Sequence, residues 1–232
     1  MKLIREGKTK KVFFDPKKKK FFLQFKNDIT AFNMKKHEIM AEKGEVNCEI
    51  TTILFGKLKE KRIPMAFKRR AGKDLIEVSD VRMIPIEVVV RNIAYGSILK
   101  RYNFKEGFKF SEPLVEFFYK DDARDDPPIS PRIAELLKVC RREDFEKMEK
   151  LAIAINDVLK TAFRAAGITL VDFKIEFGFN EKGRIVLSDE IDPDSCRLWD
   201  KKGEMLDKER FRKGMGNVME SYKEILRRLK RL

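Results

Sequence analysis

The chain has 232 residues and a formal net charge of +14, with 43% hydrophobic and 39% charged residues. This length predicts one large domain or two small ones, with ample apolar sequence for a core. The positive charge favours an anionic partner, such as nucleic acid, an acidic membrane or a phosphorylated metabolite, and does not choose among them.

Several classes of protein are excluded by what the sequence lacks. No stretch approaches the roughly 18 apolar residues that a membrane span requires, and the N-terminus lacks the apolar core of an export signal. The three cysteines are far apart and form no C-x-x-C pair, which predicts a reducing cytoplasmic compartment. The single histidine, His37, lies in a charged segment and is predicted at the surface, so the chemistry should not depend on histidine.

The N-terminal 30 residues alternate between strand-like and turn-like sequence. Residues 12–14 and 21–25 are apolar runs on either side of a lysine-rich turn, which predicts a β-hairpin. Just before it, Gly7 allows a backbone to approach a ligand closely, and Lys8 and Lys10 would share one face of a strand. Two lysines beside a glycine suit a triphosphate, although two exposed lysines are more often without function.

The central segments predict a helix followed by strands. Apolar residues at helical spacing predict a helix over residues 45–62, before Pro64. Residues 75–90 return to strand character, and the nearly continuous apolar run 83–90 predicts a strand covered on both faces. We place a domain boundary near this run, which divides the chain into residues 1–85 and 86–232.

The following segments predict a loop and two helices. Residues 121–132 are acidic and rich in proline, and a long loop of this kind is often functional in enzymes. An amphipathic helix is predicted over residues 145–163, stopped by Gly167. A last helix is predicted over residues 211–229, with an apolar stripe for the core and a basic opposite face.

Residues 170–199 form the most informative segment. Val171, Phe173, Ile175 and Phe177 alternate there with Asp172, Lys174 and Glu176. A strand with this pattern has one apolar face and one face that presents an acid, a base and an acid. A turn at 180–183 and a second apolar run at 185–187 lead to Asp189. Because Asp189 shares the parity of Leu187, it reaches the Glu176 face only if the strand ends, twists or bulges there.

This segment concentrates carboxylates beside a lysine and an arginine at the mouth of a hairpin. Such a cluster can hold Mg²⁺ together with a phosphorylated or carboxylated substrate. The alternative is a solvated hairpin whose charges pair with each other. That alternative is favoured for any one of these residues and is weaker for the whole cluster.

Four segments, taken together, resemble one known family. They are residues 6–10 (EGKTK), 85–97 (PIEVVVRNIAYGS), 171–178 (VDFKIEFG) and 189–199 (DEIDPDSCRLW), with a further match at 27–33. Their order and separations are similar to those of phosphoribosylaminoimidazole-succinocarboxamide synthase, the SAICAR synthetase family of de novo purine biosynthesis. The match over 172–199 is highly specific, whereas the lysine motif alone is weak, and Met34-Lys35 stands where a glycine is common.

The resemblance implies a fold and a reaction. The fold is α+β, with residues 1–85 as a β-rich ATP-binding part, residues 86–232 as a substrate- and metal-binding part, and a kinase-like or ATP-grasp-like cleft between them. The reaction joins L-aspartate to the carboxylate of carboxyaminoimidazole ribonucleotide (CAIR), with ATP as co-substrate and Mg²⁺ as cofactor. Its products are SAICAR, ADP and phosphate, formed through an acyl phosphate. Similar proteins are often homodimers, and neither nucleic acid nor a membrane is an implied partner.

The resemblance also assigns roles to individual residues. Lys8 and Lys10 would neutralise ATP phosphates, Glu87 and Glu176 would belong to the ATP site, the backbone of 84–88 would face adenine, and Glu176 and Asp189 would bind Mg²⁺. Arg91, Ser97, Arg197 and Arg212 would hold the phosphate and carboxylate of CAIR, because the arginine fork suits both groups. Asp172 and Lys174 would be the catalytic pair that orients the imidazole.

Other assignments are weaker or have a structural alternative. Asp28, Lys120 and Asp126 are candidates for the aspartate site, and Asp194 is a candidate brace for Arg197. Ser97 could instead cap a helix, and Arg212 could be an exposed arginine.

Two other functions compete with the ligase. An ATP-dependent phosphotransferase of kinase type would share the ATP and metal sites, but the sequence has no H-R-D catalytic loop. A nucleic-acid-binding protein would fit the charge, but the aromatic residues form core-like stripes instead of interleaving with a basic face. Dependence of ATP turnover on aspartate would separate the first from the ligase, and steep salt dependence without turnover would indicate the second.

Overall fold

The computed structural model describes residues 1–32 and 34–232, and it combines helices with two main β-sheets. The first sheet has the order β1-β2-β3-β7-β6, formed by Lys2–Glu6, Lys10–Asp15, Lys20–Phe25, Leu75–Val78 and Phe67–Arg70. A separate hairpin pairs β4 (Asp28–Ala31) with β5 (Lys36–Ile39). Asn33, part of the predicted match at 27–33, lies outside the described residues. The predicted α+β fold class is confirmed.

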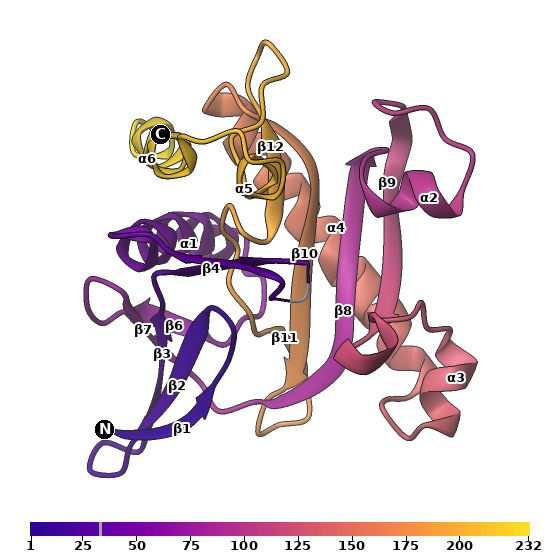
Figure 1. The fold of residues 1–232 in the computed structure, drawn as a ribbon. Coiled ribbons are helices and arrows are strands. Elements are labelled where there is room, and N and C mark those ends of the chain that lie inside the picture. Colours follow the sequence, from indigo (N-terminus) through magenta and orange to yellow (C-terminus); the bar gives the residue numbers. More distant parts are fainter. Residues whose placement is uncertain (33) are drawn as a thin grey trace.

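The second sheet is the centre of the molecule. It has the order β11-β10-β8-β9, with β12 also paired to β10. Its strands are Ile185–Leu187, Thr169–Phe179, Arg82–Ile93, Lys109–Tyr119 and Cys196–Trp199, in that order. Figure 1 shows the first sheet beside the lower end of this one. Sequence reasoning assigned no structure to β9, although it pairs along most of β8.

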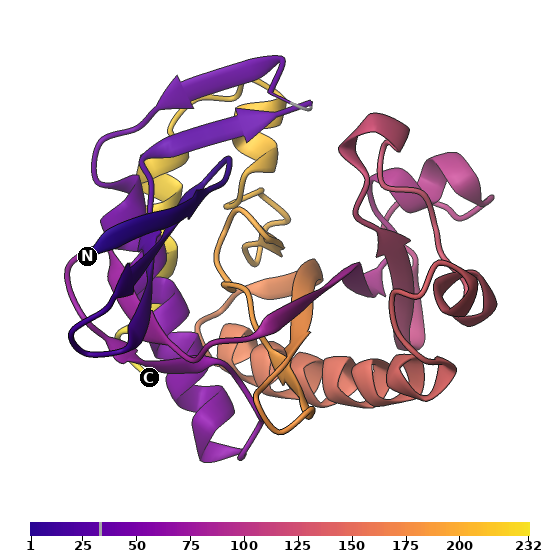
Figure 2. The same cartoon turned by 90° about the horizontal axis from the view of Figure 1, so that it is seen from below.

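Seven helical segments connect and cover the sheets in the described part of the chain. They are α1 (Lys43–Glu60), α2 (Ser97–Arg101), the 3₁₀ turn η1 (Asp122–Arg124), α3 (Pro131–Leu136), α4 (Arg142–Ala165), α5 (Glu209–Arg212) and α6 (Val218–Leu229). The predicted helices at 45–62 and 145–163 are confirmed as α1 and α4. The view from below shows α4 lying across the second sheet (Figure 2).

The single helix predicted over residues 211–229 is wrong, because the chain turns between α5 and α6. Gly214 and Gly216 have φ of +64° and +68°, and Asn217 follows with φ of +53°. These values are left-handed and cannot continue a right-handed helix. The apolar spacing carried through the break because both short helices present apolar residues to the same core.

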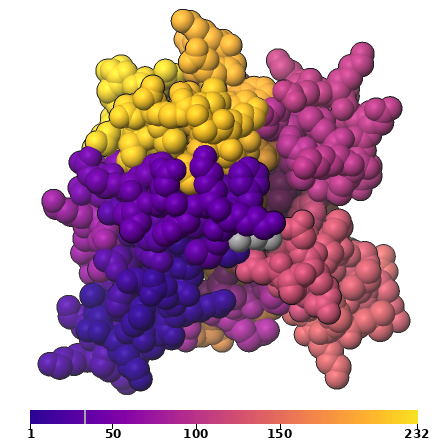
Figure 3. Space-filling view, in the orientation of Figure 1, coloured from indigo at the N-terminus to yellow at the C-terminus, as the bar shows by residue number. Residues whose placement is uncertain are grey.

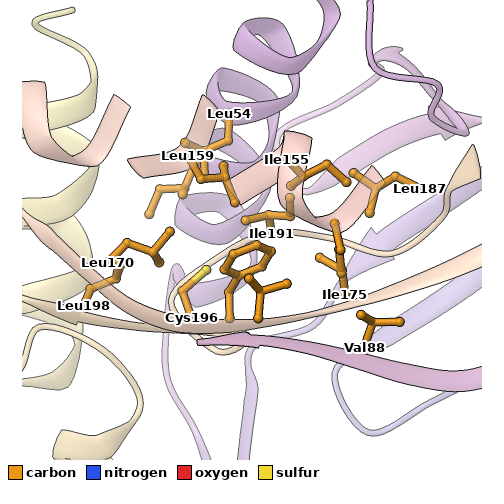
Figure 4. Packing of buried hydrophobic residues seen from close by; sticks show 14 of the residues in the cluster. Leu54, Val88, Ile155, Leu159, Leu170, Ile175, Leu187, Ile191, Cys196 and Leu198 are labelled. Carbon is orange, nitrogen blue, oxygen red and sulfur yellow. The ribbon is translucent and has the colours of Figure 1, made fainter. Parts of the chain in front are cut away.

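The main core lies between the second sheet, α4 and α1. Figure 4 shows Ile155 and Leu159 of α4 facing Ile175 and Leu170 of β10, with Leu54 of α1 beside them. These side chains are almost entirely buried. Truncating a leucine in such a core, as in Leu54→Ala, costs about 2–5 kcal/mol.

The alternation predicted for β10 is interrupted once. Leu170 and Phe173 belong to the main core, whereas Val171 packs in a smaller cluster with Ile93 and Tyr95. The pairing of β10 with β12 shifts register between Leu170 and Asp172. An extra residue at a bulge places two successive side chains on one side, so Val171 does not share the face of Phe173 as expected.

The chain shows no break at the predicted boundary. Strand β8 runs through residue 85, and α1, from the N-terminal segment, contributes to the main core. The division at residue 85 therefore stays a prediction. No helix in the described residues combines the length and apolar character that a membrane crossing would need.

Candidate active site on the polar face of the second sheet

The antiparallel register of β8 and β10 aligns the polar residues of the two strands. Asp172 lies opposite Arg91, and Glu176 lies opposite Glu87. The neighbouring core residues of both strands point to the other face, toward α4, so the polar side chains gather on one side of the sheet. Two adjacent groups result. We call the group around Glu87, Glu176 and Asp189 the acidic zone, and the group around Arg91, Arg197 and Arg212 the cationic zone.

The acidic zone is built around Glu176. Asp189 reaches it because β11 ends at Leu187, as the sequence required. Burial raises the pKa of Glu176, and the negative charge of Asp189 raises it further. Lys120 contacts Glu176, and Lys10 contacts both Asp189 and Glu190. Lysines therefore neutralise each of the two carboxylates predicted to bind a metal.

The first sheet supplies part of this zone. Lys10 stands at the start of β2, and its Nζ reaches carboxylates that are about 180 residues away in the chain. Lys8 lies nearer the surface, where its Nζ is 2.9 Å from Asp122 of η1. The structure thus brings Lys10 to the predicted metal ligands, while Lys8 connects the glycine turn to the predicted loop at 121–132.

Lys120 and Lys174 link the acidic zone to the rest of the strand face. Burial would lower the pKa of Lys120, but the carboxylates of Glu176, Asp189 and Glu87 together hold it above its usual value. Lys174 Nζ is 2.6 Å from Glu87 on β8. Glu176 and Glu87 face each other across the two strands. Lys120, a candidate for the aspartate site, contacts Glu176, and Lys174, the predicted catalytic lysine, contacts Glu87.

The cationic zone begins with Arg91, of which only 2% is exposed. Its guanidinium donates to Asp172 at 2.9 Å, to Glu116 of β9 at 2.6 Å and to the hydroxyl of Ser97 at 3.1 Å. Ser97 is the first residue of α2 and not its cap, which is Gly96. The long-range contacts of Arg91 fix a buried charge in one orientation.

Arg197 and Arg212 extend the cationic zone from β12 and α5. Arg197 donates to Asp172 at 2.8 Å and to Glu209 at 3.2 Å, and Arg212 contacts the same oxygen of Glu209. Burial raises the pKa of Asp172, and the two guanidiniums oppose that rise. Asp172 is therefore a shared partner that holds Arg91 and Arg197 side by side.

Gly96 makes room for this arrangement. A Cβ on Gly96 would lie 2.6 Å from Nη2 of Arg197, closer than real contacts allow, and its φ of +70° favours glycine. The sequence pattern Gly96-Ser97 therefore reflects both a backbone conformation and the approach of a guanidinium.

Buried contacts of Asp194 anchor the segment between Asp189 and Arg197. Asp194 accepts a hydrogen bond from Tyr222 of α6 at 2.7 Å and one from Asn47 of α1 at 3.2 Å, and it lies 2.5 Å from Nζ of Lys43. The idea that Asp194 braces Arg197 is therefore wrong. Asp172 and Glu209 brace Arg197, whereas Asp194 anchors its own loop to two helices.

The remaining aspartate candidates lie in local contacts. Asp28 is 2.8 Å from His37 and 3.6 Å from Lys26, and Asp126 accepts from the backbone N–H of Asp121 at 2.8 Å. These contacts leave their predicted role open. Arg212, for which an exposed arginine was the alternative, is instead a partly buried member of the cationic zone.

Sequence reasoning missed Glu116, Glu209 and Lys43. Glu116 lies on the unassigned strand β9, and Glu209 lies in the short helix that was merged into a longer one. Lys43 occupies the first turn of α1, where a lysine is ordinarily exposed. For these three residues the sequence offers one signal: Glu209 lies three residues before Arg212, a spacing at which opposite charges on a helix can pair.

The zones can be tested for their fit to a metal. Among residues 1–32 and 34–232, no three histidine, cysteine, aspartate or glutamate side chains group together to hold a metal ion alone. Mg²⁺ needs fewer protein ligands, because it usually binds one or two carboxylates together with substrate phosphates and water. The neighbouring Glu176 and Asp189 carboxylates fit that requirement.

Comparisons with known proteins agree over the whole chain. The family described as SAICAR synthetase matches residues 3–229. A phosphoribosylaminoimidazole-succinocarboxamide synthase of Brevibacillus brevis is 45% identical, covering 97% of this chain and 95% of that protein. A synthase of the same name from Staphylococcus aureus is 44% identical over the full length of both.

Solved structures give the same result. One described as SAICAR synthetase in complex with ADP has 41% identity and a TM-score of 0.93, covering 97% of this chain and 96% of that one. The synthase structure from Ehrlichia chaffeensis has 39% identity and a TM-score of 0.95, covering 100% and 99%. With a family match that spans nearly every residue, the chain belongs to the SAICAR synthetase family.

Proposed function

We propose that this protein is the ATP-dependent ligase that joins L-aspartate to the carboxylate of CAIR, yielding SAICAR, ADP and phosphate. The observation that carries the proposal is the pairing of an acidic zone with a cationic zone on one strand face of a SAICAR synthetase fold. A relative of 41% identity is described as a complex with ADP, which supports nucleotide binding.

The chemistry explains why two zones are needed. A carboxylate is a poor acyl donor, so the γ-phosphoryl group of ATP is first transferred to a carboxylate oxygen of CAIR, and ADP leaves. The amine of aspartate then attacks the carbonyl carbon, a C–N bond forms, and phosphate departs with its oxygen while the nitrogen loses a proton. Phosphoryl transfer of this kind depends on positioning and on neutralising charge.

The acidic zone would serve ATP. Glu176 and Asp189 would hold Mg²⁺, and a bound Mg²⁺ would supply Lewis-acid stabilisation of the phosphate charge. Lys10 lies against Asp189, and Lys8 lies nearer the surface against Asp122 of η1, so both ammonium groups would neutralise ATP phosphates from the same side as the metal ligands. Glu87 would complete this site by fixing Lys174.

The cationic zone would serve CAIR. Arg91, Ser97, Arg197 and Arg212 lie together, and the three guanidiniums are forked donors that match a phosphate or carboxylate. On β10, Asp172 lies in the cationic zone and Lys174 lies against Glu87 in the acidic zone, and these two residues would orient the imidazole ring. The space-filling view shows purple and yellow segments facing pink segments across a recess, with magenta atoms of the second sheet visible between them (Figure 3).

The proposal also covers the aspartate site, the oligomeric state and the location of the protein. Lys120 is the best placed of the candidates for L-aspartate, because it contacts Glu176. A homodimer is expected from family resemblance, and a cytoplasmic location is supported by the three cysteines, all of which are free thiols. Size-exclusion chromatography with light scattering would determine the oligomeric state.

The test is ADP release with ATP, Mg²⁺ and CAIR, run with and without L-aspartate and combined with chromatographic detection of SAICAR. We expect SAICAR to form only when all three substrates are present. Glu176→Gln should abolish turnover, while Glu181→Gln, the same change in the exposed turn between β10 and β11, should leave it unchanged. ADP release that ignores aspartate and yields no SAICAR would favour a phosphotransferase and overturn the proposal.

A further inference from the structure

Five cations and three carboxylates meet in and around the cationic zone. The cations are Arg91, Arg101, Arg197, Arg212 and Lys213, and the carboxylates are Glu116, Asp172 and Glu209. Each arginine contacts at least one of these carboxylates, so the arginines are largely neutralised. Among these eight groups the positive charges outnumber the negative ones, although the carboxylates of Asp207 and Glu106 also act on Arg197 and Lys213.

Lys213 is the cation that lacks a carboxylate partner within the described residues. Its Nζ instead donates to the phenol oxygen of Tyr95 at 2.6 Å and lies 5.4 Å from the centre of that ring. This contact raises the pKa of Lys213, and an ordinary lysine is already charged at neutral pH. A charged group held on a neutral phenol keeps its capacity to bind an anion.

Tyr95 connects Lys213 to the arginines of the zone. Its carbonyl oxygen accepts from Nη1 of Arg91 at 3.3 Å, and the guanidinium of Arg197 lies 5.4 Å from its ring centre. The ring itself is fixed, because only 4% of Tyr95 is exposed and Trp199 packs against it edge-on at 5.4 Å. One rigid residue therefore contacts three cations by three different atoms or surfaces.

The phenol also has a proton to donate. Its oxygen accepts from Lys213, so the hydroxyl hydrogen remains available for an anionic oxygen. An ammonium group and a phenol proton together extend the donor set of Arg91, Ser97, Arg197 and Arg212. Gly96, next in sequence to Tyr95, leaves space for Arg197 on the same side.

From this geometry we propose that Lys213 and Tyr95 complete the subsite for the ribose phosphate of the nucleotide substrate, an inference that rests on the proposed function. Lys213 supplies a charge to the phosphate. Tyr95 holds Lys213 and Arg197 in place and offers its phenol proton to the same phosphate. Among the described residues no hydrogen bond or ion pair joins either residue to the acidic zone, so we expect neither substitution to change the KM for ATP.

The experiment compares Lys213→Met and Tyr95→Phe in the intact enzyme, with Lys160→Met as the control. Lys160 is an exposed lysine of α4, so the control loses the same charge away from the site. We expect Lys213→Met to raise the KM for CAIR about tenfold, while kcat and the KM for ATP stay unchanged. The salt dependence of CAIR binding, measured by titration calorimetry at two NaCl concentrations, should also become shallower.

Tyr95→Phe keeps the ring and removes the hydroxyl, so folding should be preserved. We expect a smaller rise in the KM for CAIR, and the double variant should raise that KM further than Lys213→Met alone, because it also removes the phenol proton as a donor. A Lys213→Met enzyme that matches Lys160→Met in its KM for CAIR would overturn the inference while leaving the ligase function intact.

Failure of the proposed function gives a different pattern. If the wild-type protein forms no SAICAR, binding of ribose 5-phosphate is measured by calorimetry with the same variants. Weaker binding to Lys213→Met than to Lys160→Met would support the phosphate subsite without the ligase. Equal binding to both would overturn the subsite as well.

Discussion

Replacing Lys43 by methionine should destabilise the protein more than any ordinary lysine substitution. Lys43 is 1% exposed, and among the described residues it forms one ion pair, with Asp194, whose side chain is 6% exposed. Methionine fills a similar volume but carries no charge. The substitution therefore leaves Asp194 buried with the hydrogen bonds of Tyr222 and Asn47 but without its counter-charge.

The magnitude follows from the cost of an uncompensated buried charge. Removing one partner of a buried ion pair typically costs about 3–5 kcal/mol in the free energy of unfolding. Burial would raise the pKa of Asp194, but Lys43 and the charge of Lys208 outweigh that and lower it to about 2. Without Lys43 that pKa should rise, because burial then dominates.

The pH dependence has a definite sign. In the wild-type protein the folded pKa of Asp194, about 2, lies below its usual value, so its ionisation stabilises the fold at neutral pH. That stabilisation is lost as pH falls toward 2. In Lys43→Met a raised pKa reverses the effect, so the penalty should be largest at neutral pH and should shrink as the solution becomes acidic.

The assay is urea unfolding followed by circular dichroism at pH 7 and pH 4.5, with linear extrapolation to water. The control is Lys57→Met on the same helix, whose partner Glu60 is exposed, and it should change stability by about 0.5 kcal/mol or less. Adding Asp194→Asn to Lys43→Met should recover part of the loss. The reasoning is refuted if Lys43→Met and Lys57→Met unfold with the same free energy at pH 7.

Two further predictions concern the bracing of Arg197. Glu209→Gln removes the charge that joins Arg197 to Arg212 and should raise the KM for CAIR about tenfold, with the KM for ATP unchanged in steady-state kinetics. Gly96→Ala should weaken CAIR binding in calorimetry, because the new Cβ would displace Arg197, and should also cost about 1–3 kcal/mol of strain. Gly107→Ala is the control, since Gly107 has a φ of +81° but open space around it, and equal effects of the two alanines on CAIR affinity would contradict the steric explanation.

The sequence predicted those features that depend on local periodicity. The hairpin of β10 and β11, the helices α1 and α4, and the approach of Asp189 to Glu176 all follow from alternation, helical spacing and a strand end. These signals are contained in short windows, where side-chain direction is set by the backbone period. The family resemblance added the roles of residues whose local sequence is ordinary, such as Lys8.

The features that sequence reasoning missed depend on contacts between distant segments. Lys43 pairs with a residue about 150 positions away, and nothing in its own helix indicates that it is buried. Glu116 joins the site because β9 pairs with β8, and a strand pairing has no signature within one strand. The break between α5 and α6 was hidden because the apolar spacing continued across it.

The bulge in β10 explains how one strand can serve both the core and the site. A strictly alternating strand would place Val171 with Phe173 in the main core and leave Asp172 alone on the other side. The register shift instead places Val171 beside Tyr95, on the side where Asp172 meets Arg91 and Arg197. Val171 thereby packs against Tyr95, whose ring lies beside the guanidinium of Arg197, while Asp172 supplies the carboxylate that Arg197 contacts. The position of Arg197 is thus determined by packing and by charge from two successive residues, and a one-residue slip of β10 would remove both.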